Sequence, residues 1–443
     1  MAPRLRKFAI FVHRWLGLFF CALFAMWFFS GMVLAYWDYP EITERDRLAH
    51  AEVIDPSRIQ VSPEQAFASL QLDDPPGDAR LLTFDGRPAY RFDGVLVYAD
   101  DGLPQREFAP DQTMRIAAAW AQQPVAAPNV TVLDEPDQWT VSGEFGALRP
   151  LTKYSWPNGD DVYVSQISGE VVQHTTRASR LGAYLGAIPH WLYFLPLRKN
   201  GLLWSRIVIW ASGIGAITAL LGLIAGVWVT LPSKRIPYSG QKRWHVFLGL
   251  FFGVFACTWA FSGMLSMEPF SFSSGPQQIG ERIDRALHNG VFKTLEQALA
   301  EAGPGAKEVD LRELAGRPDR ILSAIQKAVE PETVAESRVV TQYEAYYLDR
   351  HQLHPLPALF VRLNDAQGSM FYIDPKTARI VEAYDSASRW NRWLYHGLHS
   401  LDLPWLYRHR PAWDIVILAL LAGGAWLSVT SLIMAWQLLR RTF

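Results

Sequence analysis

The apolar residues of this chain are concentrated in four long blocks that contain no charged residue. The blocks cover residues 15–37, 207–230, 246–267 and 415–438. A helix needs about 20 apolar residues to cross a hydrocarbon layer about 30 Å thick, and every block reaches that length. Four such blocks are too many for the buried helices of a soluble core, so the pattern predicts four transmembrane helices.

The charged residues around the blocks predict how the chain crosses the membrane. Basic residues and no acidic ones flank the blocks at both termini and in the short loop 231–243, and such segments stay in the cytoplasm. All 43 acidic residues lie in two long segments, about 38–205 and 268–412, or just after them at Asp414. We therefore expect a bacterial inner-membrane protein with cytoplasmic termini and two large periplasmic segments. The flanking basic residues are Arg4, Arg6, Lys7, Lys234, Arg235, Lys242, Arg243, Arg440 and Arg441.

The sequence also contains an internal repeat. Residues 13–21 align with residues 245–253 at an offset of 232, and the same offset pairs Ser30-Gly31 with Ser262-Gly263. Later in the chain the offset falls to 209, so the first outer segment has 23 extra residues. We infer two copies of one unit in the same orientation, related by a pseudo-two-fold axis along the membrane normal.

The predicted fold class is an α-helical membrane protein of two tandem repeats, each with two transmembrane helices and one periplasmic α+β domain. Ser62 and Thr294 are capping residues that begin helices in the two outer segments. Residues 358–374 alternate between apolar and polar positions around turn residues, as hairpins do. The expected order is transmembrane helix 1 at 8–37, periplasmic domain 1 at 38–182, an interfacial segment at 183–205, helix 2 at 206–230, a cytoplasmic loop at 231–243, helix 3 at 244–267, periplasmic domain 2 at 268–389, a second interfacial segment at 390–412 and helix 4 at 413–438.

Composition and motifs exclude several kinds of chemistry. The formal net charge of −1 gives no support for a nucleic-acid partner, and membrane lipid is the expected surrounding. The two cysteines, Cys21 and Cys257, both lie in apolar blocks, which excludes a disulfide framework or a thiol metal cluster. The sequence lacks Cys-x-x-Cys-His, so covalent c-type haem is excluded. It also lacks a nucleotide-binding motif, so any electron donor must be external.

Four of the eleven histidines are matched by the repeat, His13 with His245 and His190 with His399. The first pair lies at the cytoplasmic ends of two transmembrane helices, and the second pair lies just outside the other two. Each histidine alone could be an interfacial polar residue. Ionisable residues at membrane depth are functional candidates, however, and neutral imidazole is a good metal ligand. Two symmetric pairs, one at each membrane face, are what axial ligation of two b-type haems requires.

His396 is a further candidate at the outer site. It precedes His399 by three residues, so on a helix the two share a face. Its counterpart in the first copy is Ala187, which argues against a symmetric ligand. Either His396 or His399 could therefore be the outer ligand.

Several motifs together resemble the PepSY-associated transmembrane proteins, over nearly the whole chain. They are the segment His13-Arg14-Trp15-Leu16-Gly17-Leu18 with Ser30-Gly31, the motif Leu398-His399-Ser400-Leu401, and the hairpin at 371–377. The resemblance is closest to iron-regulated inner-membrane members, which include ferric-siderophore reductases. It implies two periplasmic PepSY-like domains and a haem-bearing reductase of iron chelates. The ligand role is carried over to the four paired histidines only.

These observations lead us to expect a membrane haem-dependent oxidoreductase of the ferric-chelate reductase type. Two haems would divide the membrane into shorter electron-transfer distances. The expected acceptor is ferric iron in a siderophore or another periplasmic acceptor, and the donor is a quinol or a cytoplasmic reductase. The main alternative is a non-catalytic PepSY module that binds a protein partner without haem. A transporter would need polar residues near the midplane, where the spans have only Ser, Thr and Gly.

Overall fold

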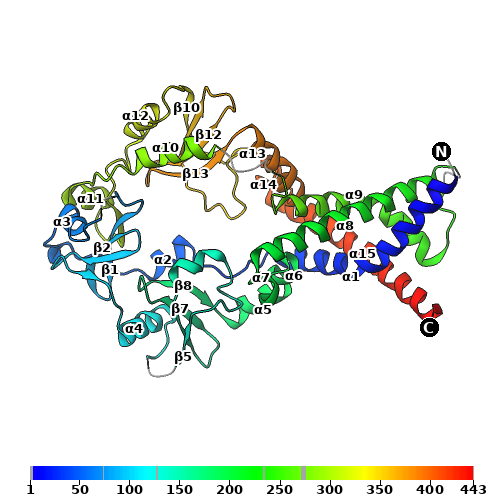
Figure 1. Cartoon of the computed structure of the whole chain (residues 1–443), viewed down its shortest axis with the longest axis horizontal. Coiled ribbons are helices and arrows are strands. Elements are labelled where there is room, and N and C mark those ends of the chain that lie inside the picture. Colours follow the sequence, from blue (N-terminus) through cyan, green and yellow to red (C-terminus); the bar gives the residue numbers. More distant parts are fainter. Residues whose placement is uncertain (1–2, 73, 126–127, 233–234, 271–275, 443) are drawn as a thin grey trace.

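Four long helices form one end of the molecule, and sheets with short helices form the other (Figure 1). The computed structural model describes the chain except residues 1–2, 73, 126–127, 233–234, 271–275 and 443, so the predicted cytoplasmic Lys234 lies outside the described residues. All four predicted blocks are confirmed as helices long and apolar enough to span a membrane. These helices are α1 (Pro3–Leu34), α8 (Gly201–Thr230), α9 (Gly240–Leu265) and α15 (Arg410–Thr442).

The four helices pack as a bundle with an apolar exterior. Helix α8 packs along α9, α1 packs along α15, and α9 also contacts α15. Phe28, Trp259 and Trp413 belong to the buried cluster between them. Phe19 and Trp210 are 80% and 69% exposed on the outside, and large apolar side chains in that position suit contact with lipid.

Each copy of the repeat forms one four-stranded antiparallel sheet beyond the bundle. The orders are β5-β6-β7-β8 in the first copy and β10-β11-β12-β13 in the second. Helix α4 (Pro110–Ala121) packs on the first sheet, whereas α10 (Gln277–Leu287) and α12 (Pro318–Ala328) pack on the second. The strands are β5 (Asn129–Leu133), β6 (Leu151–Ser155), β7 (Asp161–Ser165), β8 (Val171–Thr175), β10 (Val334–Val340), β11 (Ala358–Leu363), β12 (Met370–Asp374) and β13 (Arg379–Tyr384).

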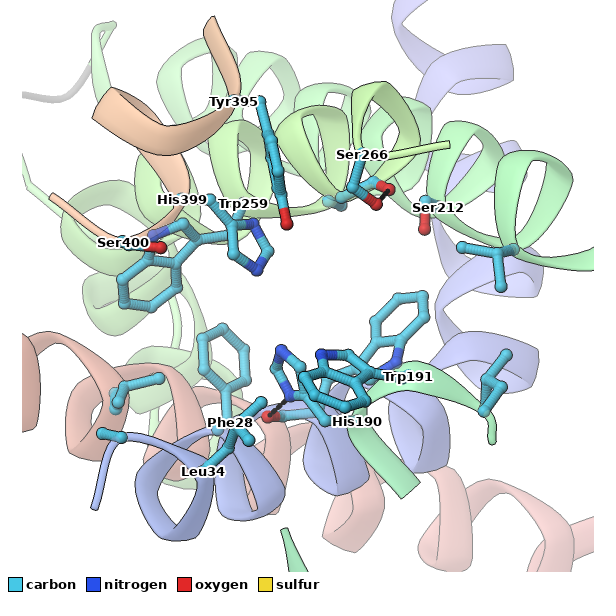
Figure 2. Close-up of a pocket in the computed structure, with 18 of the residues that line it drawn as sticks. Phe28, Leu34, His190, Trp191, Ser212, Trp259, Ser266, Tyr395, His399 and Ser400 are labelled. Carbon is cyan, nitrogen blue, oxygen red and sulfur yellow. Dashed lines mark hydrogen bonds between the residues drawn. The ribbon is translucent and has the colours of Figure 1, made fainter. Parts of the chain in front are cut away.

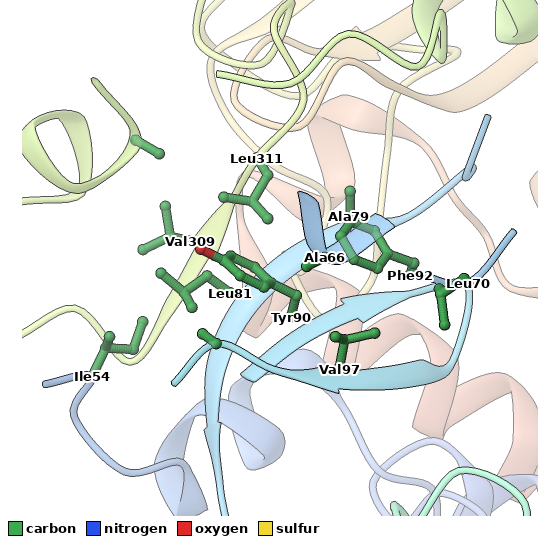
Figure 3. Packing of buried hydrophobic residues seen from close by; sticks show 12 residues of the cluster. Ile54, Ala66, Leu70, Ala79, Leu81, Tyr90, Phe92, Val97, Val309 and Leu311 are labelled. Atoms are coloured by element: carbon green, nitrogen blue, oxygen red, sulfur yellow. The ribbon is translucent and has the colours of Figure 1, made fainter. Parts of the chain in front are cut away.

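A third sheet joins the two copies at the end farthest from the bundle (Figure 1). Its order is β4-β3-β2-β1-β9, and only β9 comes from the second copy. Tyr90 and Phe92 pack with Val309 and Leu311 across this junction (Figure 3). In the described part of the second copy no strands correspond to β2 to β4, and this difference falls where the first copy has its extra residues. The strands are β1 (Ala79–Phe84), β2 (Arg87–Phe92), β3 (Val95–Tyr98), β4 (Pro104–Gln105) and β9 (Glu308–Asp310).

Short helices connect the sheets to the bundle. In the predicted interfacial segments, α6 (Ala187–Trp191) packs against α1, and a π-helical turn, η3 (Arg392–Gly397), packs against α9. These contacts bring His190 next to α1 and His399 next to α9. The other short helices are α2 (Glu44–His50), η1 (Pro56–Arg58), α3 (Pro63–Ala68), η2 (Gly143–Leu148), α5 (Arg177–Leu185), α7 (Leu195–Arg198), α11 (Leu295–Ala302), α13 (Ser386–Asn391) and α14 (Pro404–Tyr407).

Candidate functional site

Two pairs of histidines face each other, one pair at each end of the helix bundle. His13 on α1 and His245 on α9 lie near the end that carries the chain termini, and their ring centres are 6.2 Å apart. His190 on α6 and His399 after η3 lie near the end that carries the sheets, and their ring centres are 6.0 Å apart (Figure 2). We call these the terminus-side site and the domain-side site. The structure thus brings together both pairs that the repeat predicts.

The spacing within each pair fits one metal atom between two imidazoles. A metal–imidazole bond is about 2 Å long and the ring nitrogen lies about 1 Å from the ring centre, so axial imidazoles have centres about 6 Å apart. The described residues contain no group of three or more His, Cys, Asp or Glu side chains that could hold a metal ion. Each site thus presents two imidazoles at a separation that one metal atom could bridge.

Two serines orient the imidazoles of the domain-side site. Nδ1 of His190 lies 3.2 Å from Ser30 Oγ and 3.2 Å from the carbonyl oxygen of Trp27, while Nδ1 of His399 lies 2.9 Å from Ser262 Oγ. Each serine hydroxyl donates its own proton to a carbonyl of its helix, so its oxygen accepts from the imidazole. Nδ1 thus carries the proton in both rings, and Nε2 keeps the lone pair that a metal needs.

The terminus-side imidazoles have the same tautomer but different partners. Nδ1 of His13 donates to the carbonyl oxygen of Thr218 at 3.0 Å. Nδ1 of His245 lies 3.4 Å from Thr430 Oγ1 and 3.3 Å from Ser431 Oγ, and both hydroxyls donate to the Leu427 carbonyl. With both hydroxyl protons on that carbonyl, the hydroxyl oxygens can accept from Nδ1 of His245, which leaves Nε2 for a ligand. All four paired histidines present the same nitrogen for ligation.

Burial keeps the two domain-side imidazoles neutral. It lowers the pKa of His190 to about 4 and the pKa of His399 to about 3. Both residues lie outside the four long helices. At pH 7 both rings are therefore in the uncharged form that binds a metal.

Glycines give the imidazoles room. A Cβ added at Gly222 of α8 would lie 2.5 Å from Cε1 of His13, and a Cβ at Gly31 of α1 would lie 3.2 Å from Cε1 of His190. A Cβ at Gly263 would lie 3.7 Å from Cε1 of His399, which is an ordinary contact. Two of the four rings thus sit where a larger residue on the neighbouring helix would displace them.

Each pair opens into a largely apolar cavity. The volume is about 550 Å³ at the domain-side site and about 500 Å³ at the terminus-side site. Cofactor sites in proteins fall in the range of about 300–1,000 Å³. Phe28, Trp191, Trp259 and Tyr395 line the domain-side cavity around the open space between the two imidazoles (Figure 2). Aromatic walls of this kind suit a flat, apolar ring system.

Few charged side chains line the cavities. Arg14 and Lys242 are the charged residues among the described lining of the terminus-side cavity, and both are exposed at its rim. Arg350 and Asp38 line the domain-side cavity, where Arg350 Nη2 donates to Asp38 Oδ1 at 2.6 Å. At the terminus-side rim, Arg14 and Lys242 would attract the acidic groups of a ligand with an apolar body and carboxylates, such as haem b.

The structure distinguishes the two candidates for the outer ligand. His399 lines the domain-side cavity opposite His190, whereas His396 lies outside that lining, half exposed, with Nδ1 3.9 Å from Asp402 Oδ2. His396 belongs to η3 and the helical backbone continues through His399, but of the two only His399 lines the cavity. The geometry therefore sets His399, and not His396, opposite His190.

Sequence reasoning missed the groups that orient the four imidazoles. Ser30 and Ser262 were visible as a repeated pair, and the fact that both precede a repeated glycine was the available signal. Gly222, Thr430 and Ser431 have no such signal, because they lie on α8 and α15 and become neighbours of the histidines only when the helices pack.

Comparison with known proteins identifies the family. The profile described as the PepSY-associated TM region matches twice, over residues 11–242 and 242–443. The two matches divide the chain where the internal repeat does. A search of curated proteins found no match. The chain therefore belongs to the PepSY-associated transmembrane family, as the sequence motifs predict.

Proposed function

We propose that this protein is a di-haem b electron-transfer protein that reduces an acceptor outside the cytoplasmic membrane. One observation carries the proposal: two pairs of imidazoles, with ring centres about 6 Å apart in each pair, lie at opposite ends of one bundle. In every one of the four rings Nδ1 is occupied by a hydrogen bond and Nε2 is free. This repeated arrangement has no use in a simple membrane anchor.

The chain's own residues would hold and orient the cofactors. His13 with His245 and His190 with His399 would supply the axial nitrogens, and the rim cations Arg14 and Lys242 would attract the carboxylates of the ligand in the terminus-side cavity. A bound haem supplies one-electron transfer between ferric and ferrous iron. The apolar walls exclude water and so keep the imidazoles neutral.

The length of helix between the two sites supports their location near opposite membrane faces. On α1, 17 residues separate His13 from Ser30, the partner of His190, and on α9 17 residues separate His245 from Ser262. At about 1.5 Å per residue, each stretch is about 25 Å long, close to the thickness of a hydrocarbon core. Two redox sites at this separation divide the path of an electron across the membrane into shorter steps.

The direction of transfer follows from the charges and the resemblance to iron-regulated relatives. The terminus-side end carries the basic flanking residues, and this bias supports a cytoplasmic location for that end and a periplasmic location for the sheets. A quinol or a cytoplasmic reductase would be the donor. The acceptor we propose is ferric iron in a siderophore, because reduction weakens the binding of iron by hard oxygen ligands.

Reconstitution tests this function. Haem-replete protein is placed in liposomes with a reduced quinol or a membrane-impermeant reductant inside and ferric siderophore with a ferrous-iron indicator outside. We expect ferrous iron to form with the wild type and with His396→Ala, and to be lost with His13→Ala and with His399→Ala. Equal rates in all four proteins would overturn the proposal. A protein that takes up no haem would instead support a non-catalytic binding module.

A further inference from the structure

The two cavities of the bundle meet at a thin wall. Phe24, Phe28 and Ala256 line both cavities, and no other residue in the described part of the chain does so. The Phe24 and Phe28 rings are stacked, with centres 6.4 Å apart and planes 24° apart. These side chains interrupt a path that would otherwise run between the two histidine sites.

The wall breaks the symmetry of the repeat. The offset of 232 pairs Phe24 with Ala256 and Phe28 with Ala260. At two successive helical turns, the first copy thus has a phenylalanine where the second copy has an alanine. Two phenylalanines at equivalent positions would meet near the pseudo-two-fold axis, and a close-packed interior does not hold both without displacing other groups.

The surrounding helices are shaped to receive the two rings. Phe28 is 5% exposed, and its ring centre lies 5.8 Å from that of Trp259. A Cβ on Gly424 of α15 would overlap the Phe28 ring, and a Cβ on Gly215 of α8 would lie 3.4 Å from Cζ of Phe24. Small residues on both neighbouring helices therefore leave the space that the aromatic wall occupies.

We propose that Phe24 and Phe28 form an ion-tight seal that prevents the two cavities from joining into one water-filled path across the membrane. Apolar constrictions exclude water, and protons or ions cross a membrane protein along water or polar groups. Electrons do not need such a path. The seal would therefore let the protein carry electrons between its ends without conducting protons. It rests on the two cavities alone and does not depend on what fills them.

The repeat itself supplies the test, because each ring can be moved to the other copy. Wild type, Phe24→Ala and Phe28→Ala are placed in liposomes with a pH-sensitive dye inside, and a potassium diffusion potential drives proton entry. We expect proton entry to increase about tenfold or more in the alanine variants. The matched controls Phe24→Ala/Ala256→Phe and Phe28→Ala/Ala260→Phe return a ring to the repeat-equivalent position, and we expect them to be as tight as the wild type.

Two results would overturn the seal. One is a rate of proton entry in both alanine variants that equals the rate in the wild type. The other is a leak that the two swapped variants fail to reduce, since general loosening of the bundle would then explain it. Phe28→Val opens the wall with less loss of packing and gives the same comparison where an alanine variant does not fold. If the protein binds no haem but the alanine variants leak and the swapped variants do not, the proposed function is wrong and the proposed seal stands.

Discussion

The two histidine sites hold their imidazoles in different ways. At the domain-side site the side-chain partners are Ser30 and Ser262, which are equivalent in the repeat, and the Trp27 carbonyl also accepts from His190. At the terminus-side site one imidazole donates to a backbone carbonyl, and the other shares the hydroxyls of Thr430 and Ser431. The distances overlap, at 2.9–3.2 Å at the domain-side site and 3.0–3.4 Å at the terminus-side site.

This difference follows from the helices that carry the partners. The domain-side partners lie on α1 and α9, where the repeat runs without a gap. The terminus-side partners lie on α8 and α15, whose sequences match less closely. The pairing of the histidines is thus symmetric at both sites, whereas the groups that orient them are symmetric at one. We therefore expect substitutions near the histidines to affect the two sites unequally.

Loss of a paired histidine should have the largest effect. His399→Ala and His190→Ala should each remove about one of the two haems and leave the terminus-side spectrum intact, because each variant removes one of the two imidazoles of the domain-side site only. His13→Ala should remove the terminus-side haem and leave the domain-side spectrum intact. Pyridine haemochrome quantification measures the count. His396→Ala is the matched control, and a loss of haem in that variant would contradict the assignment of His399.

A graded series of glycine substitutions should come next. Gly222→Ala places a Cβ 2.5 Å from His13 and should selectively deplete the terminus-side haem, while Gly31→Ala at 3.2 Å from His190 should partly deplete the domain-side haem. Gly263→Ala at 3.7 Å from His399 should have little effect. Low-temperature spectra of the reduced proteins separate the two sites. Equal losses in all three variants would show that the ring positions differ from those described.

The orienting hydroxyls should give a smaller and unequal effect. Removing a hydrogen-bond partner of a metal-ligating histidine typically weakens metal binding by about 10- to 100-fold. Ser262→Ala should show this loss, since Ser262 is the side chain that accepts from His399. Thr430→Ala and Ser431→Ala should each lose less, because the other hydroxyl remains near His245. Haem titration of apoprotein measures the affinities. A larger loss of affinity in Thr430→Ala than in Ser262→Ala would contradict this prediction.

The smallest effect should be that of mild acid on the domain-side site. The pKa values of His190 and His399 are lowered to about 4 and about 3 from 6.5, so both folded imidazoles stay neutral at pH 5. The unfolded histidines take up protons below pH 6.5, so the apoprotein should lose some stability as the pH falls toward 5. Thermal unfolding measures that loss. The spectrum of the domain-side haem should not change between pH 8 and pH 5.

Much of this architecture could be predicted from the sequence. The uncharged blocks gave the four long helices, and the constant offsets gave the two histidine pairs. The sheet that joins the copies could not be predicted, because β9 pairs with β1 across more than 200 residues and the local sequence of neither strand indicates which strand it pairs with. The roles of Gly222 and the wall formed by Phe24 and Phe28 were equally hidden, since they depend on which helices become neighbours.

The haem content of the wild-type protein tests the central claim most directly. The protein is purified in detergent after expression with ample haem, and its spectrum is recorded oxidised and reduced with dithionite. The account predicts a sharp b-type reduced spectrum and about two haems per chain, one for each histidine pair. A colourless protein under these conditions would contradict the account, because the four imidazoles would then have no iron to bind.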